Sequence, residues 1–559
     1  MARSSYIRIL FGMRDDGQMT EPMGLMLLSA LAKKHFDVET GLWVMERDDL
    51  DETVKKFRPD LVAFSGITGS HKYYIEAAYR IKKIDKNIKI IVGGPHFTFF
   101  PGEILQHNCI DALCVGEGDD AWVEWLEAIV NNGNPNEIRN IVTRENMSRP
   151  IIMRGRKTNL DDLPFMDRAL VYDNTEFLRR YKRTIMASRG CPFRCAYCFE
   201  HQWNKMYRGV ENAGAIRQFY SVDRLLDEIE DFTNCYDTRF MKFYDDVFPP
   251  FPNLKELEWH EEFCEKYPKR IGLPFHVLTR CDLVVNLLEN HGVDILRNLK
   301  KAGMASISMS IESGNQFIRD YVITRDMAES NIKKAFAHAW KIGLPTFSNT
   351  ILGIPAPILS KPEEVGRQFE ILSELNGCQI NPKEAGLRES YKEYDKESVR
   401  FTLAQKPGFP EFPILFPYPK TKATKWCIKI GAFDGNFEKL HESYQEVSYL
   451  DCYDSEYKKV MHNLALLGSF CALFSGNRNF LMRWLDSLIQ KICLDWLAEI
   501  THPKATRFYG WLYVISKHYM HSSRTYPMKT NLKERLRFFK KLVELDFFKQ
   551  FKERKKKPI

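Results

Sequence analysis

Ser188-Arg189-Gly190-Cys191-Pro192-Phe193-Arg194-Cys195-Ala196-Tyr197-Cys198 is the stretch that decides the fold, because it places three cysteines within eight residues. Three residues separate Cys191 from Cys195, and two separate Cys195 from Cys198. Three thiolates at this spacing can hold an iron–sulfur cube and leave one iron open, whereas a fourth cysteine would close that position. A structural zinc ion, with His201 as the nearest further ligand, is the alternative. The spacing therefore favours a cluster with an open iron.

The stretch stands at the start of a series of strand and helix signals. Strands are expected over 184–188, 240–244, 275–278, 306–311, 345–352 and 378–381, and helices between them include 222–232 and 293–302. Gly303 is a plausible cap for the second of these helices. Such a βα array predicts a full or partial barrel of the TIM type, whose chemistry lies in the loops at the carboxyl ends of its strands. The three cysteines occupy the first of these loops.

A different α/β pattern precedes the cysteines. Strands are expected over 6–12, 61–65, 88–93 and 112–115, and helices over 24–34, 71–83 and 119–130. Continuous apolar runs separated by helices predict a Rossmann-like, doubly wound parallel sheet. Small and hydroxylated residues gather where its strands end, at 65–70, 93–96 and 116–118, and would let the backbone approach a large flat or phosphorylated ligand. Since no GxGxxG follows the first strand, a nicotinamide site is disfavoured.

Length and composition agree with several soluble domains. The chain has 559 residues, of which 44% are hydrophobic and 28% charged, so disordered and fibrous classes are excluded. We expect domains over 1–135, 184–400 and 401–559, with 136–183 as a linker and the last domain mainly helical. Thirteen cysteines, an odd number, and the lack of a signal-peptide pattern predict a cytoplasmic location.

The C-terminal part is basic and aromatic. Residues 501–559 contain 16 Lys and Arg against 4 Asp and Glu, so the net charge of +8 originates at this end. The run 552–557 is expected to be a solvated terminus, with contact to an anionic membrane surface as the alternative, and no specific nucleic acid is predicted. Aromatic residues over 464–497 favour an ordinary buried helix over an interfacial one suited to a lipid-like substrate. Residues 416–419 and Tyr444 would either line a substrate pocket or pack in a core.

The cysteine stretch, with Tyr197 before its last cysteine, resembles the CxxxCxxC signature of radical S-adenosylmethionine (SAM) enzymes. Further segments resemble the next four strand motifs of that family, namely 243–248, 280–283, 303–314 and 351–355, with Arg325 following the third of these. The first domain and the Asp-Asp-Leu-Pro segment at 161–164 resemble the cobalamin (B12)-binding class of the same superfamily. The resemblance covers roughly residues 5–450.

The resemblance implies roles for individual residues of the barrel. Cys191, Cys195 and Cys198 would hold a [4Fe-4S] cluster whose open iron binds the amino and carboxylate groups of SAM. Tyr197 would border the adenine. The residues that would contact polar parts of the cofactor are Asp245, Glu312 and Arg280, and Arg325 would act either as a carboxylate clamp or as a helix-cap partner.

The resemblance also implies a cobalamin site in the first domain. The residues that would border the corrin are Ser65, Thr68, Gly93, Gly94, Gly116, Glu117 and Gly118. The first loop, 12–17, lacks the histidine of the DxHxxG pattern of other cobalamin proteins, so it cannot ligate cobalt. His71 and His96 are the nearest histidines, and for both a helix-cap or tail-contacting role is favoured over ligation.

The reaction that the resemblance implies is methylation of an unactivated carbon. A 5′-deoxyadenosyl radical would abstract hydrogen, and the substrate radical would take a methyl group from methylcobalamin. The alternative is oxidative cyclisation or ring rearrangement, as in the anaerobic magnesium-protoporphyrin ester cyclase group, and a non-catalytic carrier of cluster and corrin is less favoured. The expected partners are a small-molecule or peptide substrate and an electron donor of the flavodoxin or ferredoxin type.

Overall fold

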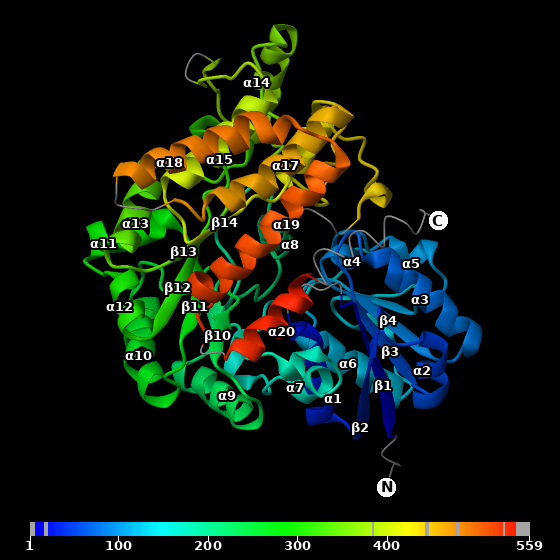
Figure 1. The fold of residues 1–559 in the computed structure, drawn as a ribbon. Helices are drawn as coiled ribbons and strands as arrows, with labels where there is room; N and C mark the ends of the chain where they lie inside the picture. Colours follow the sequence, from blue (N-terminus) through cyan, green and yellow to red (C-terminus); the bar gives the residue numbers. More distant parts are fainter. Residues whose placement is uncertain are drawn as a thin grey trace. The chain divides into compact units, whose positions relative to one another are not determined.

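The computed structural model describes residues 6–15, 21–382, 385–441, 447–475, 480–528 and 531–543. Tyr444 and the run 552–557 lie outside these residues. The chain divides into two compact units, each with one large sheet (Figure 1). The first unit comprises Met1–Arg180, Phe199–Asp237 and Phe437–Glu442, and the second comprises Tyr181–Cys198, Thr238–Asn436 and Ser443–Ile559.

The sheet of the first unit has the order β2-β1-β3-β4-β5-β6, and all its pairs are parallel except β5–β6. Its strands are β1 (Ile7–Met13), β2 (Val38–Val44), β3 (Leu61–Ser65), β4 (Lys89–Gly93), β5 (Ala112–Cys114) and β6 (Ile141–Val142). The doubly wound parallel sheet is thus confirmed. The edge strand β2 was not predicted from the sequence, because most of its residues are only half-buried and polar residues interrupt its apolar run.

Helices cover both faces of this sheet (Figure 1). The helices of this unit are α1 (Met23–His35), α2 (Leu50–Phe57), α3 (His71–Ile84), α4 (Pro95–Phe99), α5 (Glu103–Gln106), α6 (Asp119–Val130), α7 (Arg168–Tyr172), α8 (Glu200–Met206) and α9 (Val222–Cys235). Trp122 of α6 donates to the Leu28 carbonyl of α1, at 2.9 Å, and packs on Phe11 of β1. The apolar residues of α2 and α3 pack with Leu10, Val62 and Phe64 on the other face. These layers leave the carboxyl ends of the strands for loops.

The sheet of the second unit is entirely parallel, with the order β14-β13-β12-β11-β10-β7. Its strands are β7 (Lys182–Ile185), β10 (Phe240–Phe243), β11 (Phe275–Thr279), β12 (Met304–Met309), β13 (Thr346–Asn349) and β14 (Phe409–Glu411), with short β8 (Ser188–Arg189) after β7 and β9 (Gln218–Phe219) outside this unit. Because β7 and β14 are its two edges, the described strands form an open sheet, which corresponds to the partial barrel. The strand expected over 378–381 is wrong: α14 ends at Asn376 and Gly377 caps it in a left-handed conformation, so the chain turns there, and β14 is the sixth strand.

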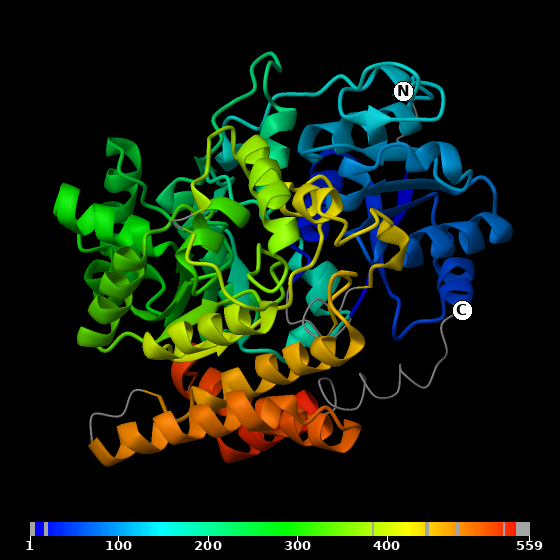
Figure 2. The same cartoon turned by 90° about the horizontal axis from the view of Figure 1, so that it is seen from above.

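Helices α10–α13 follow the strands β10–β12, and the remaining helices follow β13 and β14 (Figure 2). Their bounds are α10 (Leu254–Arg270), α11 (Cys281–His291), α12 (Ile295–Lys301), α13 (Glu329–Lys341), α14 (Pro362–Asn376), α15 (Tyr391–Ala404), α16 (Lys422–Lys429), α17 (Ser455–Cys471), α18 (Phe480–Lys491), α19 (Pro503–Met520) and α20 (Leu532–Val543), with π-helices η7 (Ile492–Trp496) and η9 (His521–Thr525). Gly303, at φ +111°, follows α12 as predicted. None of the helices in the described part of the chain has the length and apolarity of a membrane span.

The aromatic stretch 464–497 differs from the favoured expectation of one ordinary buried helix. It consists of the end of α17, then α18 and η7, separated by residues outside the described part. Leu464 and Leu467 of α17 are buried, whereas Trp484 of α18 and Trp496 of η7 are 57% and 64% exposed. Only the first part is therefore a core helix, and the second part presents its large apolar side chains to solvent.

Candidate functional site

The cysteine loop follows β7 and β8 and is tied by hydrogen bonds to two later parts of the second unit. The Ala196 N–H donates to the Ile323 carbonyl at 2.7 Å, and the Ala423 N–H donates to the Ala196 carbonyl at 2.9 Å. The Thr324 hydroxyl donates to the Arg194 carbonyl at 2.9 Å. These bonds fix the loop on both sides of Cys195, which is buried, while Cys191 and Cys198 are half-buried.

Two arginines converge on one sulfur of this loop. Arg280 Nη1 lies 3.6 Å and Arg325 Nη1 lies 3.5 Å from Cys195 Sγ. The two residues are joined as well, because Arg280 Nη2 donates to the Arg325 carbonyl at 2.7 Å. Guanidinium groups stabilise a thiolate and the negative charge of an iron–sulfur cluster bound through it. The sulfur therefore lies in an electropositive, buried environment that fits an anionic cluster.

Glu312 and Tyr197 complete this environment around Arg325. Arg325 Nη1 donates to the Tyr197 hydroxyl at 3.2 Å. Burial raises the pKa of Glu312 above its ordinary value, and the positive charge of Arg325 is the largest influence opposing that rise. Burial likewise raises the pKa of Tyr197 well above its usual range, again opposed by Arg325. Four of the residues predicted from the sequence, Tyr197, Arg280, Glu312 and Arg325, are thus brought together with Cys195.

Asp245 has a different place in this arrangement. Its carboxylate accepts hydrogen bonds from the backbone N–H of Ala187 at 3.2 Å, and from the N–H and hydroxyl of Ser188 at 2.5 and 2.6 Å. Asp245 is buried. The carboxylate therefore anchors the chain immediately before the cysteine loop, a role that the sequence did not predict because the partners are 57 and 58 residues away.

The three cysteines of the loop are the donor type that holds an iron–sulfur cube. Across the described residues, no three His, Cys, Asp or Glu side chains converge on the position of one metal ion. The ligands of a [4Fe-4S] cube bind different iron atoms and need not converge on one ion.

Tyr418, from the aromatic segment 416–419, has its pKa raised to about 12 by burial and by the nearby Cys198 thiol. The segment 416–419 therefore reaches the cysteine loop near Cys198, the last of its three cysteines.

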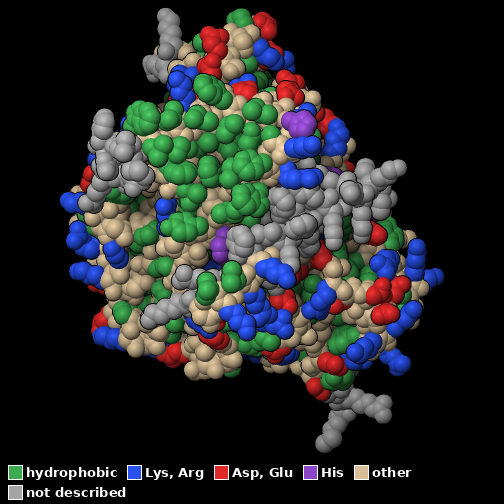
Figure 3. Space-filling view, viewed as in Figure 1, with side chains coloured by type: hydrophobic (Ala, Val, Ile, Leu, Met, Phe, Trp, Pro, Cys, Tyr) green, Lys and Arg blue, Asp and Glu red, His purple; other side chains and the backbone are tan. Residues whose placement is uncertain are grey.

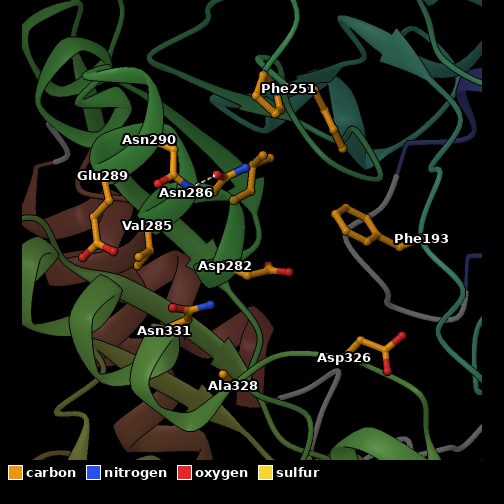
Figure 4. Close-up of a pocket in the computed structure, with 12 residues that line it drawn as sticks. Phe193, Phe251, Asp282, Val285, Asn286, Glu289, Asn290, Asp326, Ala328 and Asn331 are labelled. Atoms are coloured by element: carbon orange, nitrogen blue, oxygen red, sulfur yellow. Dashed lines mark hydrogen bonds between the residues drawn. The ribbon is translucent and has the colours of Figure 1, made fainter.

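A cavity of about 570 Å³ adjoins the arginine side of this loop (Figure 4). Phe193 of the loop and Asp326, next to Arg325, line it together with Asp282 and side chains of α11. Asp282 pairs with Arg280 through two contacts, at 2.9 and 2.8 Å. The Arg280 charge is thus balanced from the cavity side while the same guanidinium reaches Cys195.

The strands also carry a cationic side chain that the sequence analysis did not single out. Lys242 of β10 lies with its ammonium 4.3 Å from the centre of the Tyr244 ring and 5.8 Å from that of Tyr526. Burial lowers the pKa of Lys242 to about 8, opposed by Glu411 of β14. Tyr244 itself is 40% exposed. This lysine and tyrosine offer a positive charge and an aromatic ring at the carboxyl end of β10.

In the first unit, the loops after β3, β4 and β5 lie side by side. Gly94 has φ +90°, and a Cβ there would lie 2.8 Å from the Gly66 carbonyl oxygen and from Ser65 Oγ. The Gly66 N–H donates to the Gly93 carbonyl at 2.9 Å. Gly116 has φ +81°, and its Cβ would lie 2.8 Å from the Tyr207 hydroxyl. Only glycine fits at these two positions, and the loops form a continuous edge.

Several residues of this edge are open to solvent. Ser65 is exposed, and Gly93, Gly94, Gly116, Glu117 and Gly118 are half-buried. The Glu117 N–H donates to the Tyr207 hydroxyl at 3.0 Å, a contact from a segment 90 residues away that no local sequence signal could reveal. Thr68 is instead buried, with its hydroxyl 3.0 Å from His96 Nδ1. Small residues with accessible backbone fit the approach of a large flat ligand such as a corrin.

The two histidines beside this edge are both buried and engaged. The ring of His71 stacks on that of His96 with centroids 3.5 Å apart, and the Gly69 N–H donates to His71 Nδ1 at 3.2 Å. His71 Nε2 lies 3.4 Å from Glu438. Burial and the neighbouring His96 lower the pKa of His71 to about 4. His71 is the first residue of α3, and its side chain accepts a hydrogen bond from the chain just before the helix and caps none of the helix's own N–H groups.

Comparisons with known protein families agree with this geometry. A B12 binding domain model matches residues 12–126, and a Radical SAM superfamily model matches residues 185–365. The chain is a cobalamin-binding radical SAM enzyme. Its cofactors are a [4Fe-4S] cluster, SAM and cobalamin, as the resemblance of the motifs implied.

The relatives of this radical SAM enzyme include a methyltransferase and a cyclase. An uncharacterized methyltransferase of Pyrococcus horikoshii is 25% identical over 429 residues, which are 74% of this chain and 79% of that protein. The anaerobic magnesium-protoporphyrin IX monomethyl ester cyclase of Rubrivivax gelatinosus is 26% identical over 324 residues, 56% of this chain and 54% of that protein. In fold, the enzyme is similar to the cobalamin-dependent SAM radical enzyme OxsB, with a TM-score of 0.61, 13% identity and coverage of 97% and 84% of the two chains.

Proposed function

We propose that this enzyme transfers a methyl group to an unactivated carbon of a small-molecule or peptide substrate. The convergence of Arg280 and Arg325 on Cys195 carries the proposal, because it supplies the electropositive pocket that a reducible cluster needs. Similarity to a methyltransferase over most of the chain supports the transfer of methyl. When bound, the reduced cluster and SAM supply a 5′-deoxyadenosyl radical that removes hydrogen from the substrate, and cobalamin supplies the methyl group.

The residues of the second unit have distinct parts in this proposal. Cys191, Cys195 and Cys198 hold the cluster. Glu312 is buried, and the positive charge of Arg325 opposes the rise that burial causes in its pKa; its carboxyl group accepts hydrogen bonds from the ammonium or ribose hydroxyls of SAM. Tyr197 lies beside the adenine, and Asp245 positions Ser188. Lys242 and Tyr244 lie on the side of the substrate.

The residues of the first unit hold cobalamin through backbone and hydroxyl contacts. Ser65, Gly93 and Gly116 line the open edge against the corrin face. Because His71 and His96 are stacked on one another and hydrogen-bonded inside the unit, we propose that neither ligates cobalt. A cobalt without a protein ligand fits a role in giving up a methyl group.

The surroundings of the enzyme follow from its chemistry. None of the thirteen cysteines forms a disulfide bond, which supports a cytoplasmic, reducing location. Reduction of the cluster requires an external electron donor, and a small flavodoxin or ferredoxin is the class that supplies single electrons at the low potential of such clusters. We therefore propose a cytoplasmic location and an electron donor of the flavodoxin or ferredoxin type.

The experiment is anaerobic reconstitution with iron, sulfide and hydroxocobalamin, followed by reduction with SAM and chromatography of the products. Methyl transfer predicts two products: 5′-deoxyadenosine, from reductive cleavage of one SAM molecule, and S-adenosylhomocysteine, from a second SAM molecule that would give its methyl group to the cobalamin. Cys198→Ala should abolish the deoxyadenosine, whereas Cys378→Ala, which removes an exposed thiol of the same unit, should leave it unchanged.

Oxidative cyclisation is the second candidate, favoured by the similarity to the magnesium-protoporphyrin ester cyclase. It predicts deoxyadenosine without S-adenosylhomocysteine from protein loaded with cobalamin. If fully loaded protein forms neither product with any reductant, the assignment of this site to SAM cleavage is wrong.

A further inference from the structure

The C-terminal helices of the second unit present an unusual number of large apolar side chains to solvent. Trp484 and Leu488 are four residues apart on α18 and so share one side of that helix, and the exposed Trp496 of η7 follows them. On α19, Phe508, Trp511 and Tyr519 form a second stripe, with the rings of Phe508 and Trp511 stacked 6.2 Å apart. We call these six residues the aromatic face.

The aromatic face is a continuous feature of the surface. Its five aromatic side chains are between 45% and 64% exposed. Figure 3 shows hydrophobic side chains gathered over α18 and α19, and both views of the ribbon place these helices on the same side of the unit (Figures 1 and 2). The opposite sides of the helices are the packed ones, since Cys493, Tyr509 and Met520 are buried. Exposed patches of this kind mark interaction sites rather than ordinary surface.

The charges beside the aromatic face are predominantly positive. Lys491, Lys504 and Arg507 are exposed at the ends of α18 and α19. Two of the three carboxylates over 484–528 are neutralised by lysine or arginine from α15: Asp495 lies 2.6 Å from Arg400, and Glu499 is paired with Lys392 and Lys396. The surface is therefore cationic as well as aromatic.

We propose that the aromatic face docks this enzyme onto an anionic lipid membrane. Tryptophan and tyrosine favour the boundary between water and hydrocarbon, because one end of each side chain is apolar and the other can form hydrogen bonds. Lysine and arginine beside an apolar helix face add attraction to anionic headgroups. A protein partner or a second copy of the chain would not require the same combination of exposed tryptophans and exposed lysines.

The test uses the reconstituted full-length enzyme and sedimentation with vesicles. Binding is expected to vesicles of phosphatidylglycerol mixed with phosphatidylcholine, with weaker binding to phosphatidylcholine alone and at high salt. The double variant Trp496→Ser, Trp511→Ser should lower the partition into anionic vesicles by about tenfold or more. Quenching of tryptophan fluorescence by brominated lipid should occur in the unaltered enzyme and weaken in this variant.

The matched control is Trp340→Ser, which removes a tryptophan of α13 that is 39% exposed outside the aromatic face and should leave binding unchanged. Circular dichroism melting shows whether each variant is folded. The proposal is overturned if the folded enzyme stays in the supernatant with anionic vesicles, or if the double variant binds as the unaltered enzyme does. It is also overturned if the unaltered enzyme is a dimer without lipid and the double variant a monomer. None of these results depends on methyl transfer.

Discussion

Arg325→Met removes the positive charge that joins Cys195, Tyr197 and Glu312. The guanidinium makes three polar contacts, to Cys195 Sγ at 3.5 Å, to the Tyr197 hydroxyl at 3.2 Å and to the Ser310 carbonyl at 3.2 Å. Hydrogen bonds to a charged group contribute about 1.5–3 kcal/mol each. If one such contribution is lost from SAM binding, the dissociation constant rises about tenfold to a hundredfold, since 1.4 kcal/mol is a factor of ten.

Arg325→Met should also make the binding of SAM depend on pH. Burial raises the pKa of Glu312, and Arg325 opposes the rise, so the variant should hold Glu312 protonated to a higher pH. A protonated carboxyl cannot pair with the SAM ammonium. SAM binding by the variant should therefore strengthen as the pH rises and Glu312 ionises, while binding by the unaltered enzyme changes less.

The assay is equilibrium binding of SAM to anaerobically reconstituted enzyme, with iron content measured in parallel. Arg297→Met, which removes an exposed arginine paired with Asp294, is the control and should bind SAM normally. The reasoning is refuted if Arg325→Met with a full cluster binds SAM as tightly as the unaltered enzyme, or if its weaker binding does not recover with pH.

Three further substitutions test other parts of the structure. Gly94→Ala adds a Cβ 2.8 Å from neighbouring backbone at φ +90° and should reduce cobalamin retained after reconstitution, measured by absorbance, whereas Gly102→Ala, with no atom within 4 Å of its Cβ, should not. Burial raises the pKa of Asp395 from 3.8 to about 7. This carboxyl group therefore contributes stability at low pH, and that stability is lost as the pH rises through about 7. Asp395→Asn should remove this pH-dependent decline in stability from a series of thermal melts. Glu21→Gln removes the carboxylate charge that lies 3.0 Å from the buried Arg168 and should lower the free energy of unfolding in urea by about 3–5 kcal/mol.

The elements predicted well from the sequence are those whose pattern is decided by burial on both faces. The strand over 61–65 was predicted with its observed bounds, because all but its last residue are buried and apolar. The edge strand β2 and the polar helix α2 lack a long apolar run, and β14 has only three residues, one of them Pro410. Sheet edges depend on pairing with a neighbour, which a local pattern does not record.

The site shows the same division between local and long-range information. The cysteine spacing and the motifs around Arg280 and Glu312 are local, and the sequence supplied them. Asp245 is hydrogen-bonded to Ser188, 57 residues away in the sequence, and Tyr207 is hydrogen-bonded to Glu117, 90 residues away. Such partners become visible only once the strands and loops are placed.

Backbone strain is concentrated in the same part of the second unit, which contains three of the five residues other than glycine that have left-handed φ in the described part of that unit. Glu312, Thr324 and Asp326 have φ of 70°, 42° and 47°, in the left-handed region that side chains other than glycine rarely adopt. Each such residue costs about 1–3 kcal/mol and persists only where the surroundings hold it. Thr324 and Asp326 flank Arg325, and the Thr324 hydroxyl is bonded to the Arg194 carbonyl of the cysteine loop. The strained turn thus directs Arg325 at Cys195, and a chain selected for stability alone would have no reason to retain it.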